Sequence, residues 1–202
     1  MTEGQQAKSL IRKHLREVLM AMPSATRHAK SVAACSLITA SPEFAAARVV
    51  MVYASMPTEV DTAPLALRAW QAGKTVVLPK VSWDQRRMLP VEISSLTAGM
   101  TETAGTGIRE PVAGNPMPVE FIDLVIVPGL GFTNTGARIG RGMGFYDRFL
   151  AQEKFVGLSC GLAFNEQVIE DLPVLDHDVP LSMLATDQGL RRFASNCIER
   201  GQ

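Results

Sequence analysis

The sequence predicts an α/β fold built on a parallel sheet, and two observations carry this prediction. The first is a strand–helix–strand pattern, in which the apolar runs VVMVYAS (49–55) and TVVLPKV (75–81) flank a helix-like segment. A βαβ unit of this length joins two parallel strands. The second is DLVIVPG (123–129), the strongest strand signal in the chain, which a glycine-rich loop follows at once. Because ligands of open parallel sheets bind at the carboxyl ends of strands, we expect the chemistry in this loop.

Helices are expected before the first strand and between the first two strands. From about residue 5 to residue 22, apolar side chains recur at helical spacing with basic residues between them. Pro23 interrupts this pattern, and Ser24 is placed to cap a second helix that runs to about residue 40. Residues 61–64 mark the start of the helix that connects the two strands, and Gly73 marks its end.

The second half of the chain is expected to add weaker and shorter elements. MLPVEI (88–93) is a weaker strand signal, and residues 94–118, rich in Thr, Gly and Pro, are typical of a loop. GFYDRFLAQE (144–153) suits a short helix, and further strands are expected at FVGLSCG (155–161) and SMLAT (182–186). The sequence has no internal repeat and no low-complexity linker, so residues 1–202 are expected to form one domain.

The composition is typical of a globular protein with a sizeable core, because 47% of the 202 residues are hydrophobic and 20% are charged. Twenty basic residues balance twenty acidic ones, which argues against a net field that attracts nucleic acid or a membrane. The three cysteines are far apart and form no CxxC pair, which argues against a disulfide framework and against a thiolate metal site. The N-terminus is charged and lacks the features of a signal peptide, so we expect a cytoplasmic location.

The glycine-rich loop nearly matches two known phosphate-binding motifs and then departs from both. Residues 131–136 have the outer glycine spacing of a P-loop, but Ala137 and Arg138 stand where Lys and Ser or Thr are needed. Gly129 and Gly131 open like a dinucleotide-binding fingerprint, but Asn134 occupies the place of its third glycine. Neither motif therefore explains the loop.

The run RIGRGMGFYDR (138–148) predicts a third kind of anion site. Without Cβ atoms at alternate positions, successive backbone N–H groups can turn toward one anion and form a nest. Arg138 and Arg141 add forked donors for phosphate, and Asp147 could hold a Mg²⁺ ion that the phosphates also bind. The alternative is a tight structural turn with exposed arginines. The position of the loop after the strongest strand favours the phosphate site.

Other candidate residues are weaker. Lys8 and Arg12 are four residues apart and share one helix face, but spacing alone favours a solvated face. The three histidines are scattered, with no spacing typical of a zinc site. The sequence GxSxG is absent, so a serine hydrolase is disfavoured.

The run RIGRGMGFYDRFL, preceded by IDLVIVPGLGF, closely resembles the 5-formyltetrahydrofolate cyclo-ligase family, also called methenyltetrahydrofolate synthetases. Four further stretches resemble this family in the same order: KSLIRKHLR, YASMPTEVDT with AGKTVVLPKV, GIREP, and LPVLDHDVPLSMLAT. The resemblance implies one three-layer αβα domain with a mostly parallel, Rossmann-like sheet. It also implies a ligase of folate one-carbon metabolism, which uses ATP and Mg²⁺ to convert 5-formyltetrahydrofolate into 5,10-methenyltetrahydrofolate, ADP and phosphate.

The resemblance also implies roles for individual residues. It assigns ATP binding to Lys8, Arg12, Arg138, Ile139, Gly140, Arg141, Gly142, Met143, Gly144, Phe145 and Tyr146. It assigns folate binding to Ala54, Glu59, Arg141, Gly142, Met143, Gly144 and Phe145, with the Glu59 carboxylate on the pterin N–H groups. It makes Arg141, Tyr146 and Asp147 catalytic, and Asp147 and Asp178 ligands of Mg²⁺.

Two residues depart from the family pattern. Phe145 stands where the family commonly has Tyr, and Thr133 stands where it commonly has Asp, a role for which Asn134 could substitute. One alternative is therefore a non-catalytic relative that binds folate or nucleotide. Another is a different nucleotide-dependent enzyme on the same scaffold. The expected partners are small molecules, without nucleic acid or membrane, and the expected state is a monomer or weak homodimer.

Overall fold

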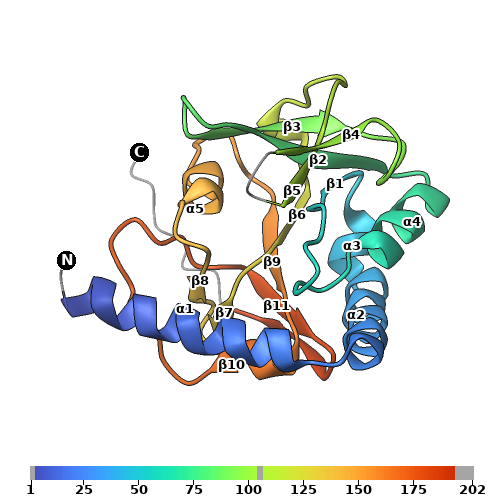
Figure 1. Cartoon of the computed structure of the whole chain (residues 1–202). Helices are drawn as coiled ribbons and strands as arrows, with labels where there is room; N and C mark the ends of the chain where they lie inside the picture. The colour runs from blue at the N-terminus through green and yellow to red at the C-terminus, as the bar shows by residue number, and fades with distance from the viewer. Residues whose placement is uncertain (1–2, 104–106, 194–202) are drawn as a thin grey trace.

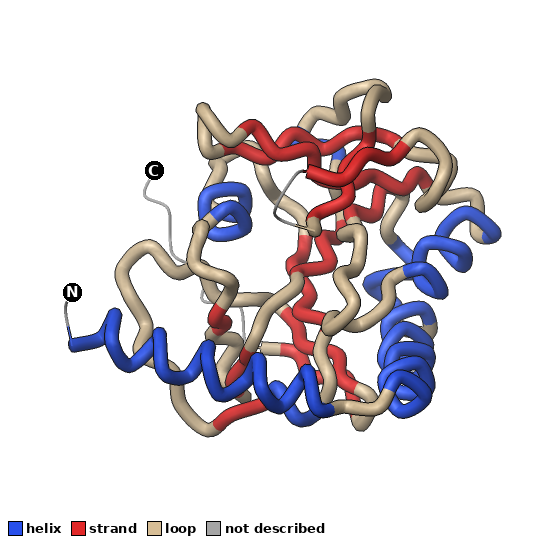
Figure 2. The backbone as a smooth tube through the Cα atoms, viewed as in Figure 1, coloured by secondary structure: helices blue, strands red, loops and turns tan. Residues whose placement is uncertain are grey.

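A central sheet organises the chain, of which the computed structural model describes residues 3–103 and 107–193 (Figures 1 and 2). The sheet has seven strands in the order β12-β11-β9-β6-β1-β2-β3. The strands are β1 (Val49–Met51), β2 (Thr75–Ser82), β3 (Arg87–Glu92), β6 (Leu124–Val127), β9 (Leu158–Leu162), β11 (Met183–Thr186) and β12 (Gly189–Arg192). Neighbouring strands from β2 to β11 run parallel, and the two edge strands β3 and β12 run antiparallel. The expected α/β fold with a mostly parallel sheet is confirmed.

Helices cover both faces of this sheet. They are α1 (Glu3–Ala21), α2 (Ser24–Thr39), α3 (Pro42–Ala46), α4 (Ala63–Gln71) and α5 (Phe145–Leu150). In Figure 1, α2 and α4 lie on one side of the sheet and α5 lies on the other. Buried residues of α1, α2 and α4 share one core cluster, whereas those of α5 belong to a second. The layers are therefore helix, sheet and helix.

Strand β6 shows why the sequence encodes this arrangement. Leu124 and Ile126 belong to the core beneath α1, α2 and α4, and Val125 and Val127 belong to the core beneath α5. Successive side chains of a strand point to opposite faces, so a strand covered on both sides needs a continuous apolar run. All four side chains are at most 1% exposed, which explains why this strand gave the strongest signal.

Local contacts set the ends of the helices. Pro23, rather than Ser24, occupies the N-cap position of α2, and no side chain caps this helix. The expectation for Ser24 was therefore wrong by one residue. Arg27 instead donates to the carbonyl oxygens of Leu19 and Met22 at the end of α1, at 2.7 and 2.8 Å. Such bonds satisfy carbonyl groups that have no partner within the helix.

Several short elements were not predicted. The segment 94–118, expected as a loop, contains the antiparallel pair β4 (Met100–Thr103) and β5 (Ile108–Pro111). A second small sheet contains β10, β7 and β8. Strands β7 (Gly131–Thr133) and β8 (Arg138–Ile139) lie within the glycine-rich stretch, and β10 (Val168–Ile169) pairs with β7 from later in the chain. The helix α3, the strand β12 and the 3-10 turns η1 (Val119–Phe121) and η2 (Asn165–Gln167) were also missed. Elements of two to five residues carry too little periodicity to be recognised.

The strand order reverses between β1 and β6. From β1 the chain continues to β2 and β3 on one side, and from β6 it continues to β9 and β11 on the other. Doubly wound sheets bind ligands in the crevice that such a reversal opens at the carboxyl ends of the strands.

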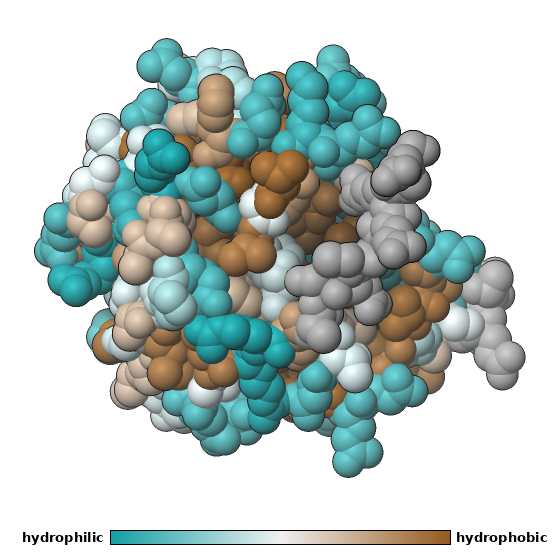
Figure 3. Space-filling view, turned by 180° about the vertical axis from the view of Figure 1, so that it is seen from behind, coloured by the Kyte–Doolittle hydropathy of each residue, from teal (hydrophilic) through white to brown (hydrophobic). Residues whose placement is uncertain are grey.

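In the described residues, no helix combines the length and the hydropathy that crossing a membrane requires. On the face opposite to Figure 1, hydrophobic side chains reach the surface near the middle, with hydrophilic ones around them (Figure 3).

Candidate active site

A cavity of about 640 Å³ opens at this reversal of the strand order. Its walls come from α1, the loop after β1, the strands β2 and β3, the loop after β6, and the glycine-rich loop. The volume lies within the range that small-molecule sites occupy. The cavity lining includes every residue of the expected site except Ile139, which is buried at 2% exposure.

The first two glycines after β6 serve packing. A Cβ atom at Gly129 would lie 2.6 Å from the ring of Phe132, and one at Gly131 would lie 2.6 Å from the side chain of Leu15. Any larger residue would therefore push α1 and β7 away from the strand end. Close packing therefore accounts for these two glycines, and their resemblance to a dinucleotide-binding fingerprint does not require a bound dinucleotide.

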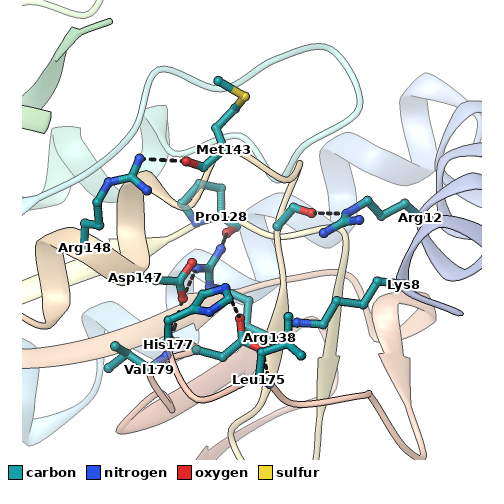
Figure 4. Close-up of polar contacts among 12 residues, drawn as sticks. Lys8, Arg12, Pro128, Arg138, Met143, Asp147, Arg148, Leu175, His177 and Val179 are labelled. Carbon is teal, nitrogen blue, oxygen red and sulfur yellow. Dashed lines mark hydrogen bonds and ion pairs between the residues drawn. The ribbon is translucent and has the colours of Figure 1, made fainter. Parts of the chain in front are cut away.

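The later glycines shape the loop itself. Gly142 and Gly144 have φ values of 106° and 63°, which residues with a Cβ rarely adopt. The carbonyl oxygen of Gly140 accepts a hydrogen bond from Arg12 Nε at 2.9 Å, and that of Met143 accepts one from Arg148 Nη2 at 2.7 Å (Figure 4). The loop between them lies over the cavity, with Arg141, Gly142 and Met143 exposed.

Arg138 lies beneath this loop, with a side chain that is only 5% exposed. Its Nη2 donates to Asp147 Oδ1 at 2.9 Å, and its Nη1 donates to the carbonyl oxygen of Pro128 at 3.3 Å. The guanidinium also lies 5.8 Å from the ring centroid of Tyr146. Arg138 therefore joins the end of β6 to α5. Its Nε is buried without a hydrogen-bond partner among the described residues. A ligand atom that accepts a hydrogen bond from this Nε would therefore bind favourably here.

Lys8 reaches the same region from α1. Its Nζ lies 2.5 Å from Asp178 Oδ2, and the residue is 6% exposed. Asp178 Oδ2 also accepts the backbone N–H of Leu175 at 2.8 Å. Burial alone would raise the pKa of Asp178, but the hydrogen bonds from Lys8 and Leu175 outweigh it and lower this pKa. Asp178 is therefore held as a carboxylate, and the solvated face that spacing alone favoured for Lys8 is wrong.

Glu59 and Arg141 meet across the cavity mouth. Arg141 Nε and Nη2 both donate to Glu59 Oε1, at 3.2 and 3.0 Å. The backbone N–H of Met56 donates to Glu59 Oε2 at 3.0 Å. The Glu59 side chain is 12% exposed and the Arg141 side chain 37% exposed, so the carboxylate lies deeper than its partner. Glu59 is thus a positioned, paired carboxylate and not a solvated loop residue.

Aromatic and apolar side chains line the cavity between these charged groups. The rings of Phe145 and Trp83 contact edge to face, with centroids 5.3 Å apart. Ala54 is half-buried beside Tyr53, whose hydroxyl donates to Val60. Burial and the charge of Glu59 raise the pKa of Tyr146, so its phenol stays neutral and can donate a hydrogen bond.

Asp147 and Asp178, the carboxylates that the resemblance assigns to a divalent cation, both line the cavity. The described residues contain no group of three or more His, Cys, Asp or Glu that could hold a metal ion by themselves. Mg²⁺ commonly uses one or two carboxylates together with water and phosphate oxygens, so the chemistry of these donors is compatible with the ion. The backbone N–H of Val179 donates to Asp147 Oδ1 at 3.4 Å, which links the segments that carry the two carboxylates.

Thr133 has a local role that accounts for one departure. Its Oγ1 accepts the backbone N–H groups of Thr135 and Ala137, at 3.3 and 3.1 Å, and closes the turn between β7 and β8. The hydroxyl thus supports the turn where the family pattern has Asp. Asn134, which could have taken this role, is instead hydrogen-bonded to Arg191.

Sequence reasoning missed part of the cavity wall. The lining residues that it did not assign to the site are Gln5, Ser9, Tyr53, Met56, Pro79, Val81, Trp83, Met88, Ile108, Arg109, Pro128, Gly129, Leu175 and His177. Some lay within stretches quoted for the resemblance, such as Arg109 in GIREP and His177 in DHDV. Trp83 and Met88 carried no local signal, because only the pairing of β2 with β3 brings them to the site.

Comparisons with known proteins agree on one family. The model of the 5-formyltetrahydrofolate cyclo-ligase family matches residues 4–187. A protein of Escherichia coli K12 named 5-formyltetrahydrofolate cyclo-ligase is 32% identical over 152 residues, covering 72% of this chain and 81% of its own. A mouse protein of the same name is 27% identical over 182 residues, covering 86% of this chain and 90% of its own. The solved structure of Aquifex aeolicus 5,10-methenyltetrahydrofolate synthetase is similar with a TM-score of 0.79 and 31% identity, covering 96% of this chain and 94% of its own.

Proposed function

The chain belongs to the 5-formyltetrahydrofolate cyclo-ligase family, and from this premise we propose that it works by ATP-dependent phosphorylation of the formyl oxygen. Its activity as a cyclo-ligase converts 5-formyltetrahydrofolate into 5,10-methenyltetrahydrofolate. The chemistry makes an activating group necessary, because the N5-formyl group is amide-like and its oxygen is a poor leaving group. ATP supplies that activation, and Mg²⁺ assists it.

The proposed reaction has two steps. The formyl oxygen attacks the γ-phosphorus of ATP, ADP leaves, and the formyl carbon becomes part of an imidate-like phosphate. N10 of the folate then attacks this carbon, the N10 proton is lost, and the carbon–oxygen bond breaks to release phosphate. Phosphoryl transfer depends on positioning and charge neutralisation rather than on a protein nucleophile. A cavity rich in arginines and backbone amides supports this route, because it supplies positioning and positive charge.

We assign the nucleotide to the glycine-rich loop. The residues proposed to bind ATP are Lys8, Arg12, Arg138, Ile139, Gly140, Arg141, Gly142, Met143, Gly144, Phe145 and Tyr146. The backbone amides of the loop and the guanidinium of Arg141 would contact the phosphates. Arg138 and Ile139 would act from beneath the loop, because both are buried. Lys8 would add positive charge from α1.

We assign the folate to the side of the cavity formed by the loop after β1. Glu59 would accept hydrogen bonds from the pterin amino and ring N–H groups. The two oxygens of a carboxylate can accept from two neighbouring N–H groups at once. Ala54 and residues 141–145 would contact the ring system. Phe145 lies edge to face with Trp83, so we propose that its ring offers the folate an apolar contact surface.

Asp147 and Asp178 would hold Mg²⁺. The ion supplies neutralisation of phosphate charge when it is bound. Arg138 orients the Asp147 carboxylate through Oδ1, and Lys8 orients Asp178 through Oδ2. The neutral phenol of Tyr146 and the guanidinium of Arg141 are proposed to stabilise the transferring group and the leaving phosphate by donating hydrogen bonds.

One observation supports the proposal most: Glu59, a carboxylate paired with Arg141, and the glycine-rich loop line the same cavity. The test follows the near-ultraviolet absorbance of the methenyl product with purified protein, 5-formyltetrahydrofolate, ATP and Mg²⁺. We expect product only when all three are present. Product without ATP would refute the activation step, and folate binding without any product would identify a non-catalytic relative. The single domain over residues 1–202, the cytoplasmic location and the monomer or weak homodimer stay predictions.

A further inference from the structure

We propose that Arg148 is a positioning residue of the nucleotide site, which turns the backbone of the glycine-rich loop toward the phosphates and fixes the loop to the β2–β3 hairpin. The inference rests on the proposed function, because it needs ATP at this loop. Arg148 is not among the residues that line the cavity. Its role would be to hold other groups in place.

The contacts of Arg148 lie on both sides of the loop. It belongs to α5 and donates from Nη2 to the carbonyl oxygen of Met143 at 2.7 Å (Figure 4). It donates from Nε to the carbonyl oxygen of Arg86 at 2.9 Å. Its guanidinium carbon lies 5.3 Å from the ring centroid of Phe145. One side chain thus joins the glycine-rich loop, the hairpin and the aromatic wall.

Peptide geometry converts these contacts into a direction for the amides. In a trans peptide the carbonyl group and the following N–H point in opposite directions. No cis peptide bond occurs in the described residues. The carbonyl of Met143 points to Arg148, so the N–H of Gly144 points away from it. In the same way the carbonyl of Gly140 points to Arg12, so the N–H of Arg141 points away from Arg12.

Arg12 and Arg148 therefore hold the two ends of the loop. Between these ends, the amides of residues 141–144 donate no hydrogen bond to any described residue. Unpaired backbone N–H groups in a cavity are what an anion-binding nest requires. Without the hold at Met143, the flexible glycines would let this peptide rotate and would replace the N–H by a carbonyl that repels phosphate.

Arg148 also links the two substrate sites. The hairpin residue Arg86 has a φ value of 50°, so its carbonyl is presented from a tight turn. The same hairpin carries Trp83, which contacts Phe145. A lysine could not make both bonds, because its single ammonium lacks the rigid fork that reaches two carbonyl groups at once.

The test compares wild type with Arg148→Ala, Arg148→Lys and a control, Arg87→Ala. Arg87 is an exposed arginine of β3, outside the cavity lining. Calorimetry would measure binding of ATP with Mg²⁺, and steady-state assays would measure KM for each substrate and kcat. For Arg148→Ala we expect ATP binding about tenfold weaker, the equivalent of roughly 1.4 kcal/mol for lost charged hydrogen bonds. Millimolar guanidine should restore part of that binding, and Arg148→Lys should remain weak.

The outcomes separate the inference from the proposed function. If Arg148→Ala binds ATP as wild type does, the inference is wrong while the function stands. If wild type binds no ATP, the proposed function itself fails. An equal loss of ATP and folate binding together with a lower melting temperature would show a general structural role and would also overturn the inference. Arg87→Ala should match wild type throughout.

Discussion

Replacing Glu59 by Gln should weaken folate binding and leave ATP binding intact or stronger. The change keeps the shape of the side chain and removes its charge. Gln can still accept the Met56 N–H through its carbonyl oxygen, but its amide nitrogen accepts nothing. The substitution therefore has opposite effects on the two ligands. Folate binding weakens because the pterin loses a charged acceptor, whereas ATP binding does not weaken because Arg141 loses only the partner that holds it at the cavity mouth.

The expected magnitude follows from these two terms. Hydrogen bonds to a charged group contribute about 1.5–3 kcal/mol, and this is what folate loses. Folate no longer has to displace Arg141 from Glu59, and a partly exposed ion pair of this kind is worth roughly 0.2–1 kcal/mol. The difference is about 1–2 kcal/mol, or a dissociation constant for folate that rises about 5- to 30-fold. Release of Arg141 toward the phosphates should tighten ATP binding by at most about fivefold.

Calorimetry with each ligand alone would measure both constants. Glu92→Gln is the matched control, because Glu92 is an exposed carboxylate of β3 outside the cavity lining. Folate binding that is unchanged in Glu59→Gln would remove Glu59 from the folate site. ATP binding that weakens as much as folate binding would show that Glu59 supports the structure of the whole cavity and does not bind folate selectively.

Three further predictions test the metal site, one surface ion pair and the core. Asp147→Asn should lower Mg²⁺-dependent turnover at least about 100-fold while circular dichroism stays unchanged, because a phosphoryl-transfer site depends on the carboxylate that holds its ion; near-normal turnover would exclude Asp147. The hydrogen bond from Arg192 lowers the pKa of Glu43 from 4.5 to about 2, so this pair stabilises the fold above pH 4.5 and the effect is lost as the pH falls toward 2. The melting temperature of Glu43→Gln should therefore lie below that of wild type at pH 7 and converge with it near pH 2, and a constant gap would contradict this. Ile126→Ala, at a fully buried position of β6, should reduce the free energy of unfolding in urea by about 2–5 kcal/mol, whereas less than about 1 kcal/mol would mean that the core is looser than described.

The long, strongly patterned elements of the fold could be predicted from the sequence. The strand at 123–129 and the helices near 5–22 and 24–40 were recognised because burial on both faces, or on one helix face, leaves a clear pattern. The pair β4–β5 was not recognised, since its strands expose much of their surface and contain polar residues. The strand expected over 49–55 ends at Met51, because the chain after it leaves the sheet to line the cavity.

The site also contains residues that local sequence could locate and residues that it could not. The glycine-rich loop and Asp147 could be located from local sequence alone, because glycine, arginine and aspartate at that spacing have a specific chemistry. Glu59 and Asp178 could be named only through the resemblance to a family, and Lys8, which helix spacing had marked as a basic position, was assigned to the site only through it. Their pairing with Arg141 and with each other depends on contacts between segments up to 170 residues apart. Trp83 could not be found at all, since only strand pairing places it against Phe145.

In the proposed reaction, the formyl oxygen becomes the acceptor of the γ-phosphoryl group. The most direct measurement uses 5-formyltetrahydrofolate labelled with oxygen-18 in the formyl group and follows the label by mass spectrometry after a single turnover with ATP and Mg²⁺. We expect the label to leave in the released phosphate, with one labelled oxygen for each methenyl product formed. Label that appears in water, with unlabelled phosphate, would contradict phosphorylation of the formyl oxygen.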